Sequence, residues 1–242
     1  MEIIETKFND LKILGIGSEG VVYEKDNKAI KVFRNNNDFN DKYKKIMLMK
    51  ALDFEFIAKP INFVSSNNIP VGYEMELIKD SIDLYTVLND NTIDQKIDML
   101  KKLEENIIEL HKKHIVLVDC NLHNFLVRKN EIINIDIDNY MVGNLNPNVL
   151  PDYYYPYYSK KVTNVIDKNF DKFQMTLNAI EHLANSKLYK NLLSKYNSKS
   201  DYLEYYLKKI DINQELREFL LLQTSDSLNK EYVGKYLKLF KK

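Results

Sequence analysis

Short apolar segments, bounded by glycine, asparagine or proline, fill the first third of the chain. Segments of this kind are typical of strands. The expected strands cover residues 11–13, 21–23, 29–33, 61–64 and 72–78. Between the third and the fourth, residues 38–52 carry apolar positions at helical spacing and predict a helix. Residues 1–78 therefore predict a small sheet with one helix, which forms the first of two expected domains.

The rest of the chain, residues 79–242, has a mainly helical pattern and forms the second expected domain. A long helix is expected to follow Thr92, since Gln95 completes a capping box and an apolar stripe continues to Leu110. Two short strands, within residues 125–127 and 132–137, form a predicted hairpin. Further helices are expected from Asp171 onward and over residues 201–210, 215–222 and 230–240. The combined pattern predicts an α+β fold.

Composition and charge change this picture little. Hydrophobic residues make up 45% of the chain and charged residues 29%, which is ordinary for a globular protein. Lys plus Arg and Asp plus Glu both number 35, so net charge gives no support for a nucleic-acid or membrane-surface partner. The single cysteine excludes an internal disulfide. The chain also has no apolar run of membrane-spanning length, and its N-terminus does not resemble a signal peptide. Together with the single cysteine, these features predict a cytoplasmic protein.

Candidate chemistry begins at three glycines between the first two predicted strands. Gly15, Gly17 and Gly20 form a G-x-G-x-x-G pattern, whose backbone can approach a phosphate closely. A dinucleotide-binding loop would need a helix after the third glycine, whereas a strand is predicted there. Lys31 lies inside a later apolar strand, where its ammonium must reach either water or an anion.

A second group of polar residues surrounds the predicted hairpin. Asp119 and Asn124 form the pattern Asp-x-x-x-x-Asn, and Asp136 follows twelve residues later in an apolar run. The hairpin could bring all three to one end of a sheet. Carboxylate and amide oxygens suit Mg²⁺ with phosphates, and a further carboxylate can accept a proton from a hydroxyl. The alternative is that these are ordinary turn residues.

Other reactive side chains give weaker signals. His111, His114 and His123 lack a known zinc-binding spacing, so no metal site is expected there. Cys120 is expected to be a small buried thiol, not a nucleophile. The tyrosine-rich segment 152–158 predicts either a substrate-docking surface or simple aromatic packing.

In their order and spacing, these motifs resemble the protein-kinase family over nearly the whole chain. The glycine pattern resembles the loop over the ATP phosphates, and Lys31 the lysine that holds the α- and β-phosphates. Asp119 and Asn124 match the catalytic base and the metal-binding asparagine, and Asp136 the magnesium-binding aspartate. The resemblance implies a two-lobed protein-kinase-like fold. It also implies a phosphotransferase that uses ATP and Mg²⁺ and acts on a hydroxyl, most simply Ser or Thr of a protein.

The resemblance further assigns the nucleotide contacts. Residues 75–78 resemble the hinge that binds adenine, and Leu126 the floor of the adenine pocket. The residues expected to bind the nucleotide are Gly15, Gly17, Ser18, Glu19, Gly20, Val22, Ala29, Lys31, Glu76, Ile78 and Leu126. Asp119, Lys31 and Asn124 are expected to be catalytic, and Asn124 and Asp136 to bind the metal. Asp171 resembles the start of the central helix of the C-terminal lobe.

Some positions depart from the family pattern. Asp136-Ile137-Asp138 stands where Asp-Phe-Gly is usual, and Leu117-Val118 stands where His-Arg precedes the catalytic aspartate. The helix glutamate that pairs with the lysine is missing, because its place falls on the cationic Lys44 or Lys45. Asp38 or Asp41, one turn earlier, could replace it. This combination resembles a divergent bacterial or phage Ser/Thr kinase. A small-molecule kinase of the same fold and a nucleotide-binding pseudokinase are the alternatives.

Overall fold

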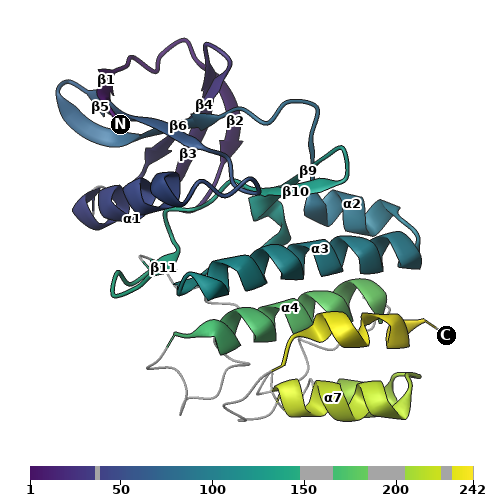
Figure 1. Ribbon diagram of the computed structural model, residues 1–242. Coiled ribbons are helices and arrows are strands. Elements are labelled where there is room, and N and C mark those ends of the chain that lie inside the picture. The colour runs from purple at the N-terminus through teal and green to yellow at the C-terminus, as the bar shows by residue number, and fades with distance from the viewer. Residues whose placement is uncertain (36–38, 148–165, 185–204, 225–230, 242) are drawn as a thin grey trace. The chain divides into compact units, whose positions relative to one another are not determined.

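The computed structural model has an α+β fold with a mixed six-stranded sheet and several helices (Figure 1). It describes residues 1–35, 39–147, 166–184, 205–224 and 231–241. Asp38 and the tyrosine-rich segment 152–158 lie outside these residues. The chain divides into two compact units. Unit 1 comprises Met1–Ile82 and Asn124–Asn139, and unit 2 comprises Asp83–His123 and Tyr140–Lys242. Residues 124–139 thus group with the N-terminal unit, whereas the sequence alone placed them in the second domain.

Unit 1 is built on the six-stranded sheet, whose strand order is β1-β5-β6-β4-β3-β2. The strands are β1 (Ile3–Glu5), β2 (Lys12–Ile16), β3 (Gly20–Lys25), β4 (Lys28–Phe33), β5 (Pro60–Ser66) and β6 (Ile69–Glu76). The β1–β5 pair is parallel and the other pairs are antiparallel. Five strands match the sequence prediction, and β1 was missed because three half-exposed residues carry little pattern. The predicted strand 72–78 ends earlier, at Glu76, because the Lys79 N–H bonds to the Leu77 carbonyl in a turn.

Helix α1 (Phe39–Leu52) packs against β5 through an aromatic cluster. Tyr43 stacks on Phe63, and Phe39 contacts both Phe33 and Phe63. Phe33 and Phe63 are buried, so their burial fixes α1 on the sheet. This helix and the sheet form the core of unit 1.

Two glycines allow close approach to β4. A Cβ at Gly72 would clash with the Lys31 carbonyl, and a Cβ at Gly20 would clash with the Val32 carbonyl. Because any larger residue would push these strands apart, both glycines hold β3 and β6 tightly against the strand that carries Lys31.

The predicted hairpin is present as β9 (Phe125–Arg128) and β10 (Glu131–Asn134), which pair antiparallel. Its turn places Lys129 and Asn130 at positive φ, as two-residue hairpins require. The second strand stops at Asn134 and not at residue 137. There the Asn134 backbone bonds to the Phe56 carbonyl and the Ala58 N–H, and the chain then turns away.

Unit 2 is mainly helical. Its elements, with those at its borders, are β7 (Ile82–Asp83), α2 (Leu84–Asp90), α3 (Ile93–Lys112), β8 (Ile115–Val116), η1 (Leu122–Asn124), β11 (Met141–Val142), α4 (Lys168–Leu183), α7 (Gln214–Thr224) and the 3-10 segment η4 (Val233–Phe240). The Thr92–Gln95 capping box of α3 is confirmed. Helix α4 packs on α3, and η4 packs on both (Figure 1).

Several boundaries in unit 2 differ from the sequence prediction. Helix α2 was missed, although the Asp83 side chain caps its first turn. Helix α4 begins before Asp171, because Asp167 caps it. The helix predicted over 215–222 is present as α7, and residues 205–209 are helical, but the segment predicted over 230–240 is a 3-10 helix. Among the described residues, no helix is long and apolar enough to span a membrane.

Candidate functional site

The side chain of Lys31 lies inside unit 1 and pairs with two carboxylates. Its Nζ is 2.5 Å from Asp136 Oδ1 and 2.6 Å from Asp138 Oδ1. Lys31 is only 6% exposed, so, of the two expected outcomes, its ammonium contacts anions and not water. Burial lowers the pKa of Lys31, but the two carboxylates outweigh it and raise that pKa well above its ordinary value. Lys31 is therefore a fixed positive charge.

The two aspartates differ in their access to solvent. The side chain of Asp136 is 24% exposed, whereas that of Asp138 is fully buried. Burial raises the pKa of Asp136 to about 7, against the opposing ammonium of Lys31. Burial also acts to raise the pKa of Asp138, but Lys31 and Lys42 outweigh it and hold that pKa below its ordinary value. Asp138 is thus the carboxylate that keeps its negative charge beside Lys31.

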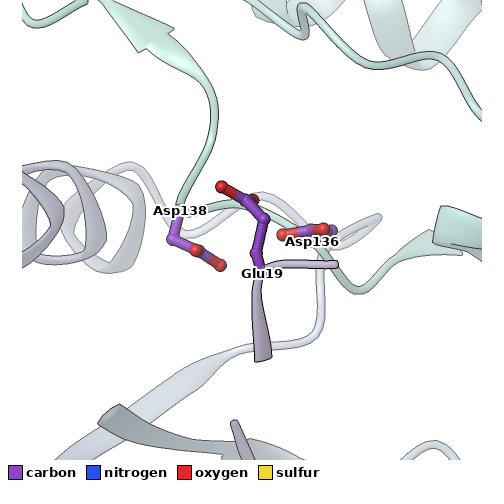
Figure 2. A group of neighbouring side chains, drawn as sticks. All are labelled: Glu19, Asp136 and Asp138. Carbon is purple, nitrogen blue, oxygen red and sulfur yellow. The ribbon is translucent and has the colours of Figure 1, made fainter. Parts of the chain in front are cut away.

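Glu19, from the glycine-rich turn, joins the aspartates in an acidic cluster (Figure 2). One carboxylate oxygen from each of Glu19, Asp136 and Asp138 lies within 4.8 Å of the others. Carboxylate oxygens are hard ligands of the kind that bind Mg²⁺. Asp138 is fully buried, so Glu19 and Asp136 are the two members of the cluster that a metal ion can reach.

Asn124 and Asp136 are brought to the same end of the β9–β10 hairpin. The Ile135 N–H bonds to the Asn124 carbonyl at 3.0 Å, one step beyond the last paired residues of the ladder. The Asp136 N–H in turn bonds to the side chain of Asn134 at 3.1 Å. Asn124 and Asp136 thus lie at one end of the hairpin, as predicted, whereas Asp119, the third residue of that prediction, belongs to unit 2.

The glycine-rich turn is closed by its own backbone. The Gly17 N–H bonds to the Gly20 carbonyl at 2.9 Å, and the Arg34 N–H bonds to the Glu19 carbonyl at 2.9 Å. The turn, with Ser18, links β2, which contains Gly15, to β3, as the pattern predicted, and no helix follows it.

The remaining predicted nucleotide contacts also lie in unit 1. Val22 and Ala29 come from β3 and β4, Glu76 ends β6, and Ile78 is buried just after it. Leu126 is half-buried on β9.

Helix α1 presents lysines, and not an acid, to this cluster. Lys42 Nζ lies 3.8 Å from Asp138 Oδ2, and Lys45 Nζ lies 3.4 Å from the Asp138 carbonyl oxygen. Asp41 instead pairs with Lys44 on the exposed side of the helix, at 3.4 Å. The suggestion that Asp41 replaces the missing helix glutamate is therefore wrong, since Asp136 and Asp138 are the acids that hold Lys31.

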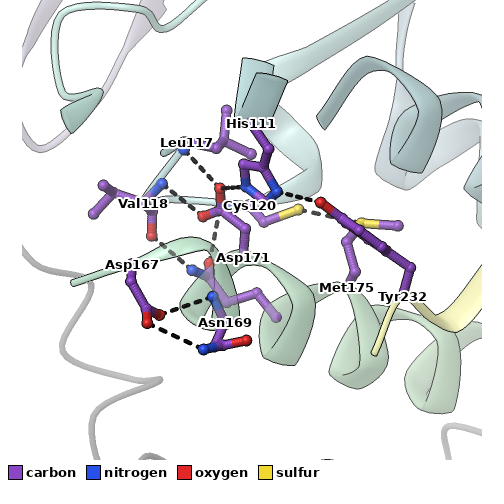
Figure 3. Close-up of polar contacts among 10 residues, drawn as sticks. His111, Leu117, Val118, Cys120, Asp167, Asn169, Asp171, Met175 and Tyr232 are labelled. Atoms are coloured by element: carbon purple, nitrogen blue, oxygen red, sulfur yellow. Dashed lines mark hydrogen bonds and ion pairs between the residues drawn. The ribbon is translucent and has the colours of Figure 1, made fainter. Parts of the chain in front are cut away.

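In unit 2, the segment before Asp119 is held by Asp171 of α4 (Figure 3). Its carboxylate accepts the N–H groups of Leu117 and Val118 at 2.7 and 2.9 Å. It also contacts His111 Nε2 at 2.8 Å, and the Nδ1 of that histidine lies 2.6 Å from the Tyr232 hydroxyl. His111 is thus a buried structural residue.

Two more α4 side chains bind the same segment. Gln174 accepts the Cys120 N–H at 2.8 Å and donates to the Val118 carbonyl at 2.7 Å. Asn178 donates to the Cys120 carbonyl at 3.0 Å. Val118 has a φ of 72°, which is strained for a β-branched residue. The α4 side chains therefore hold the backbone beside Asp119 in a conformation that it would not adopt freely.

Asp119 itself is half-buried in unit 2, and its Oδ1 accepts the Asn121 N–H at 3.1 Å. This is the turn contact that the alternative interpretation predicted. The neighbouring Cys120 is fully buried, and burial raises the pKa of its thiol well above the ordinary value. A protonated, buried thiol is a poor nucleophile, which confirms the prediction for Cys120.

Sequence reasoning assigned Glu19 to the nucleotide contacts but did not predict its place beside the aspartates, and it gave no site role to Asp138 or to the inward lysines of α1. A signal was present for some of them. Asp136 and Asp138 are only two residues apart in the sequence, and Lys42 and Lys45 share a helix face with the buried Ile46 and Met49.

Comparisons with known proteins supply no further assignment. No protein-family model matches the chain, and a search of curated proteins found no match. The function is therefore inferred from the residues of the two units.

Proposed function

We propose that this chain is an ATP- and Mg²⁺-dependent phosphotransferase with a two-lobed protein-kinase-like fold. It transfers the γ-phosphate of ATP to a hydroxyl, most simply that of Ser or Thr in a protein substrate. The observation that carries the proposal is the buried ammonium of Lys31, held by two carboxylates next to a glycine-rich turn. A fixed cation, hard oxygen ligands and a turn that admits close backbone approach are the groups that a nucleotide triphosphate with Mg²⁺ requires.

The order of the elements supports the same proposal. A glycine-rich turn joins β2 and β3, the buried lysine follows on β4, and α1 comes next. A hairpin then carries Asn124 and Asp136 at one end. In unit 2, a buried aspartate of α4 holds the segment before Asp119. This order along the chain is the one that the resemblance to protein kinases implies.

Each residue has a separate role in the proposed reaction. Backbone N–H groups of the glycine-rich turn and the Lys31 ammonium bind the phosphates, and Asn124 and Asp136 supply metal ligands. When bound, Mg²⁺ would neutralise charge on the β- and γ-phosphates. Asp119 orients the acceptor hydroxyl and accepts its proton as the oxygen bonds to the γ-phosphorus and ADP leaves. The proposed partners are ATP and a protein substrate in the cytoplasm.

A nucleotide-binding protein without catalysis is the second candidate. It is favoured by the contact between Asp119 and the Asn121 N–H, because a turn-capping role explains that contact without any chemistry. The two candidates agree on ATP binding and differ in phosphoryl transfer, so the two properties need separate measurements.

Thermal unfolding with and without Mg-ATP tests the shared step. Binding to the folded state raises the free energy of unfolding by about 2.7 kcal/mol when the ligand is at a hundredfold excess over Kd, and this raises the melting temperature. Lys31→Met should reduce this shift. Lys12→Met is the matched control, since Lys12 is exposed and paired with Glu24. An unmoved wild-type transition at saturating Mg-ATP, with no heat of binding, would exclude the proposal.

Transfer is then measured with labelled ATP and a whole-cell lysate. Labelled proteins support the protein kinase. Label found only in small molecules would instead assign a small-molecule kinase of the same fold. ATP binding without any transfer would assign the non-catalytic candidate.

A further inference from the structure

The cluster around Lys31 contains more charge than phosphate and metal binding require. Three lysines, Lys31, Lys42 and Lys45, are each at most 6% exposed, and all three approach Asp138. A buried ammonium is costly unless it is paired and hydrogen-bonded. One aspartate therefore lies at the centre of a group of cations that come from two different elements, β4 and α1.

We propose that Asp138 positions the Lys31 ammonium for the nucleotide phosphates, and that α1 acts on Lys31 through Asp138 by means of Lys42. In the family that the sequence resembles, a glutamate of this helix contacts the lysine directly. Here α1 instead contributes the cation Lys42, which contacts Asp138. This inference rests on the proposed function, in which Lys31 binds phosphate, and it assigns separate roles to the two aspartates.

Burial separates the two aspartates. Asp138 is fully buried and also lies within 3.4 Å of the Tyr73 hydroxyl, so an incoming metal ion cannot reach it without displacing the surrounding side chains. Asp136 is about a quarter exposed and lies at the end of the hairpin with Asn124. Asp136 is therefore free to exchange Lys31 for a metal ion, while Asp138 keeps its hold on the lysine.

Helix α1 contacts Asp138 through its buried lysines, whereas Asp41 of the same helix lies on the exposed face. Lys42 and Lys45 occupy positions i and i+3 on the buried face, together with Ile46 and Met49. Asp41 lies on the exposed face, where it pairs with Lys44. Lys42 also lies over the Phe33 ring, 4.2 Å from its centroid, which limits where its ammonium can move. A displacement of α1 would thus move the cation that helps to hold Asp138.

A double-mutant cycle on ATP affinity tests whether Asp138 acts through Lys31. Calorimetry would measure ATP binding to wild type, Lys31→Met, Asp138→Asn and the double variant. A charge-assisted contact contributes enough that Asp138→Asn should weaken ATP binding about tenfold or more. The double variant should bind no more weakly than Lys31→Met alone, because the aspartate has no other route to the phosphates. Additive losses would show a structural role and would overturn the inference.

Magnesium titration separates the roles of the two aspartates. The Mg²⁺ concentration that gives half of the gain in ATP affinity should rise in Asp136→Asn and stay unchanged in Asp138→Asn. The reverse pattern would place the metal ligand two residues further along the chain. It would overturn the inference while leaving ATP binding, and hence the proposed function, intact.

Two further variants test the part played by α1. Lys42→Met should weaken ATP binding a few-fold, and Lys44→Met, on the exposed face of the same helix, should not. If Asp138→Asn alone does not fold, as judged by circular dichroism, Asp138→Asn with Lys42→Met removes one charge of each sign and serves in its place. Equal ATP affinity for wild type and Lys42→Met would exclude control by α1. A wild-type protein that binds no ATP would instead reject the proposed function itself.

Discussion

At the scale of single residues, Asp119 can both cap a turn and act as the proposed base, and the geometry allows the two roles together. Its Oδ1 caps a turn through the Asn121 N–H, and under the proposed function the carboxylate also accepts the proton of a substrate hydroxyl. Asparagine can cap such a turn nearly as well as aspartate, but it cannot accept a proton in the same way. Substitution by asparagine therefore separates the two roles.

We expect Asp119→Asn to keep ATP affinity within a few-fold of wild type while phosphoryl transfer falls about 10²–10⁴-fold. The residues proposed to bind the nucleotide lie in unit 1, so the substitution leaves them unchanged. Single-turnover transfer from labelled ATP measures chemistry apart from product release. Wild-type transfer rates in the variant would show that Asp119 serves the turn alone.

The residues of the candidate site were predictable where the chemistry is carried by spacing. Spacing singled out Gly17, Gly20, Lys31, Asn124 and Asp136, all of which belong to unit 1. Spacing did not reveal the partners of Lys31, because pairing across more than a hundred residues leaves no local periodicity. The resemblance to kinases also directed attention to an acid on α1, where the structure has lysines.

At the scale of elements, α4 does more than cover α3 with its apolar side. Asp171, Gln174 and Asn178 lie at i, i+3 and i+7, on one face of the helix, and bind successive backbone groups of residues 117–120. The apolar stripe predicted the helix correctly. It could not reveal this polar face, because a hydrophobic pattern shows buried Gln and Asn as polar positions, the same as exposed ones.

Gln174→Leu should loosen the segment that carries Asp119. The Cys120 N–H and the Val118 carbonyl would each lose a buried partner, at roughly 1–3 kcal/mol per group. We expect a lower midpoint in urea unfolding and slower transfer, with ATP affinity retained. Lys168→Ala, at the start of the same helix, is the control. Reduced stability with an unchanged transfer rate would show that the segment keeps its geometry without Gln174.

At the scale of the whole molecule, the C-terminal η4 segment is attached to α3 by a titratable contact. The Glu104 carboxylate accepts the Gly234 N–H at 2.8–2.9 Å, across 130 residues of sequence. A Cβ at Gly234 would clash with this carboxylate, so a larger residue there would force the Glu104 side chain to move. Burial raises the pKa of Glu104 to about 7, although the N–H groups of Gly234 and Val233 oppose the change.

This contact predicts a pH dependence of stability. The folded state binds a proton at Glu104 up to about pH 7, whereas the unfolded chain releases it near pH 4.5. Stability from this group is therefore complete below pH 4.5 and is lost as the pH rises through 7, by about 1.4 kcal/mol for each unit of pKa difference. Glu104→Gln should reduce the fall in melting temperature between pH 5 and 7.5. Equal slopes for the two proteins would contradict the assignment.

The discontinuity of unit 1 has a consequence for biosynthesis. Lys31 leaves the ribosome more than a hundred residues before Asp136 and Asp138, which are its partners in the folded protein. A nascent chain that ends at residue 82 would have the whole sheet but would bury an ammonium without either carboxylate, at a cost of several kcal/mol. The N-terminal unit should therefore become protease-resistant only after residue 139 has emerged, so a stall within α3 would expose a complete but unstable sheet to chaperones and proteases.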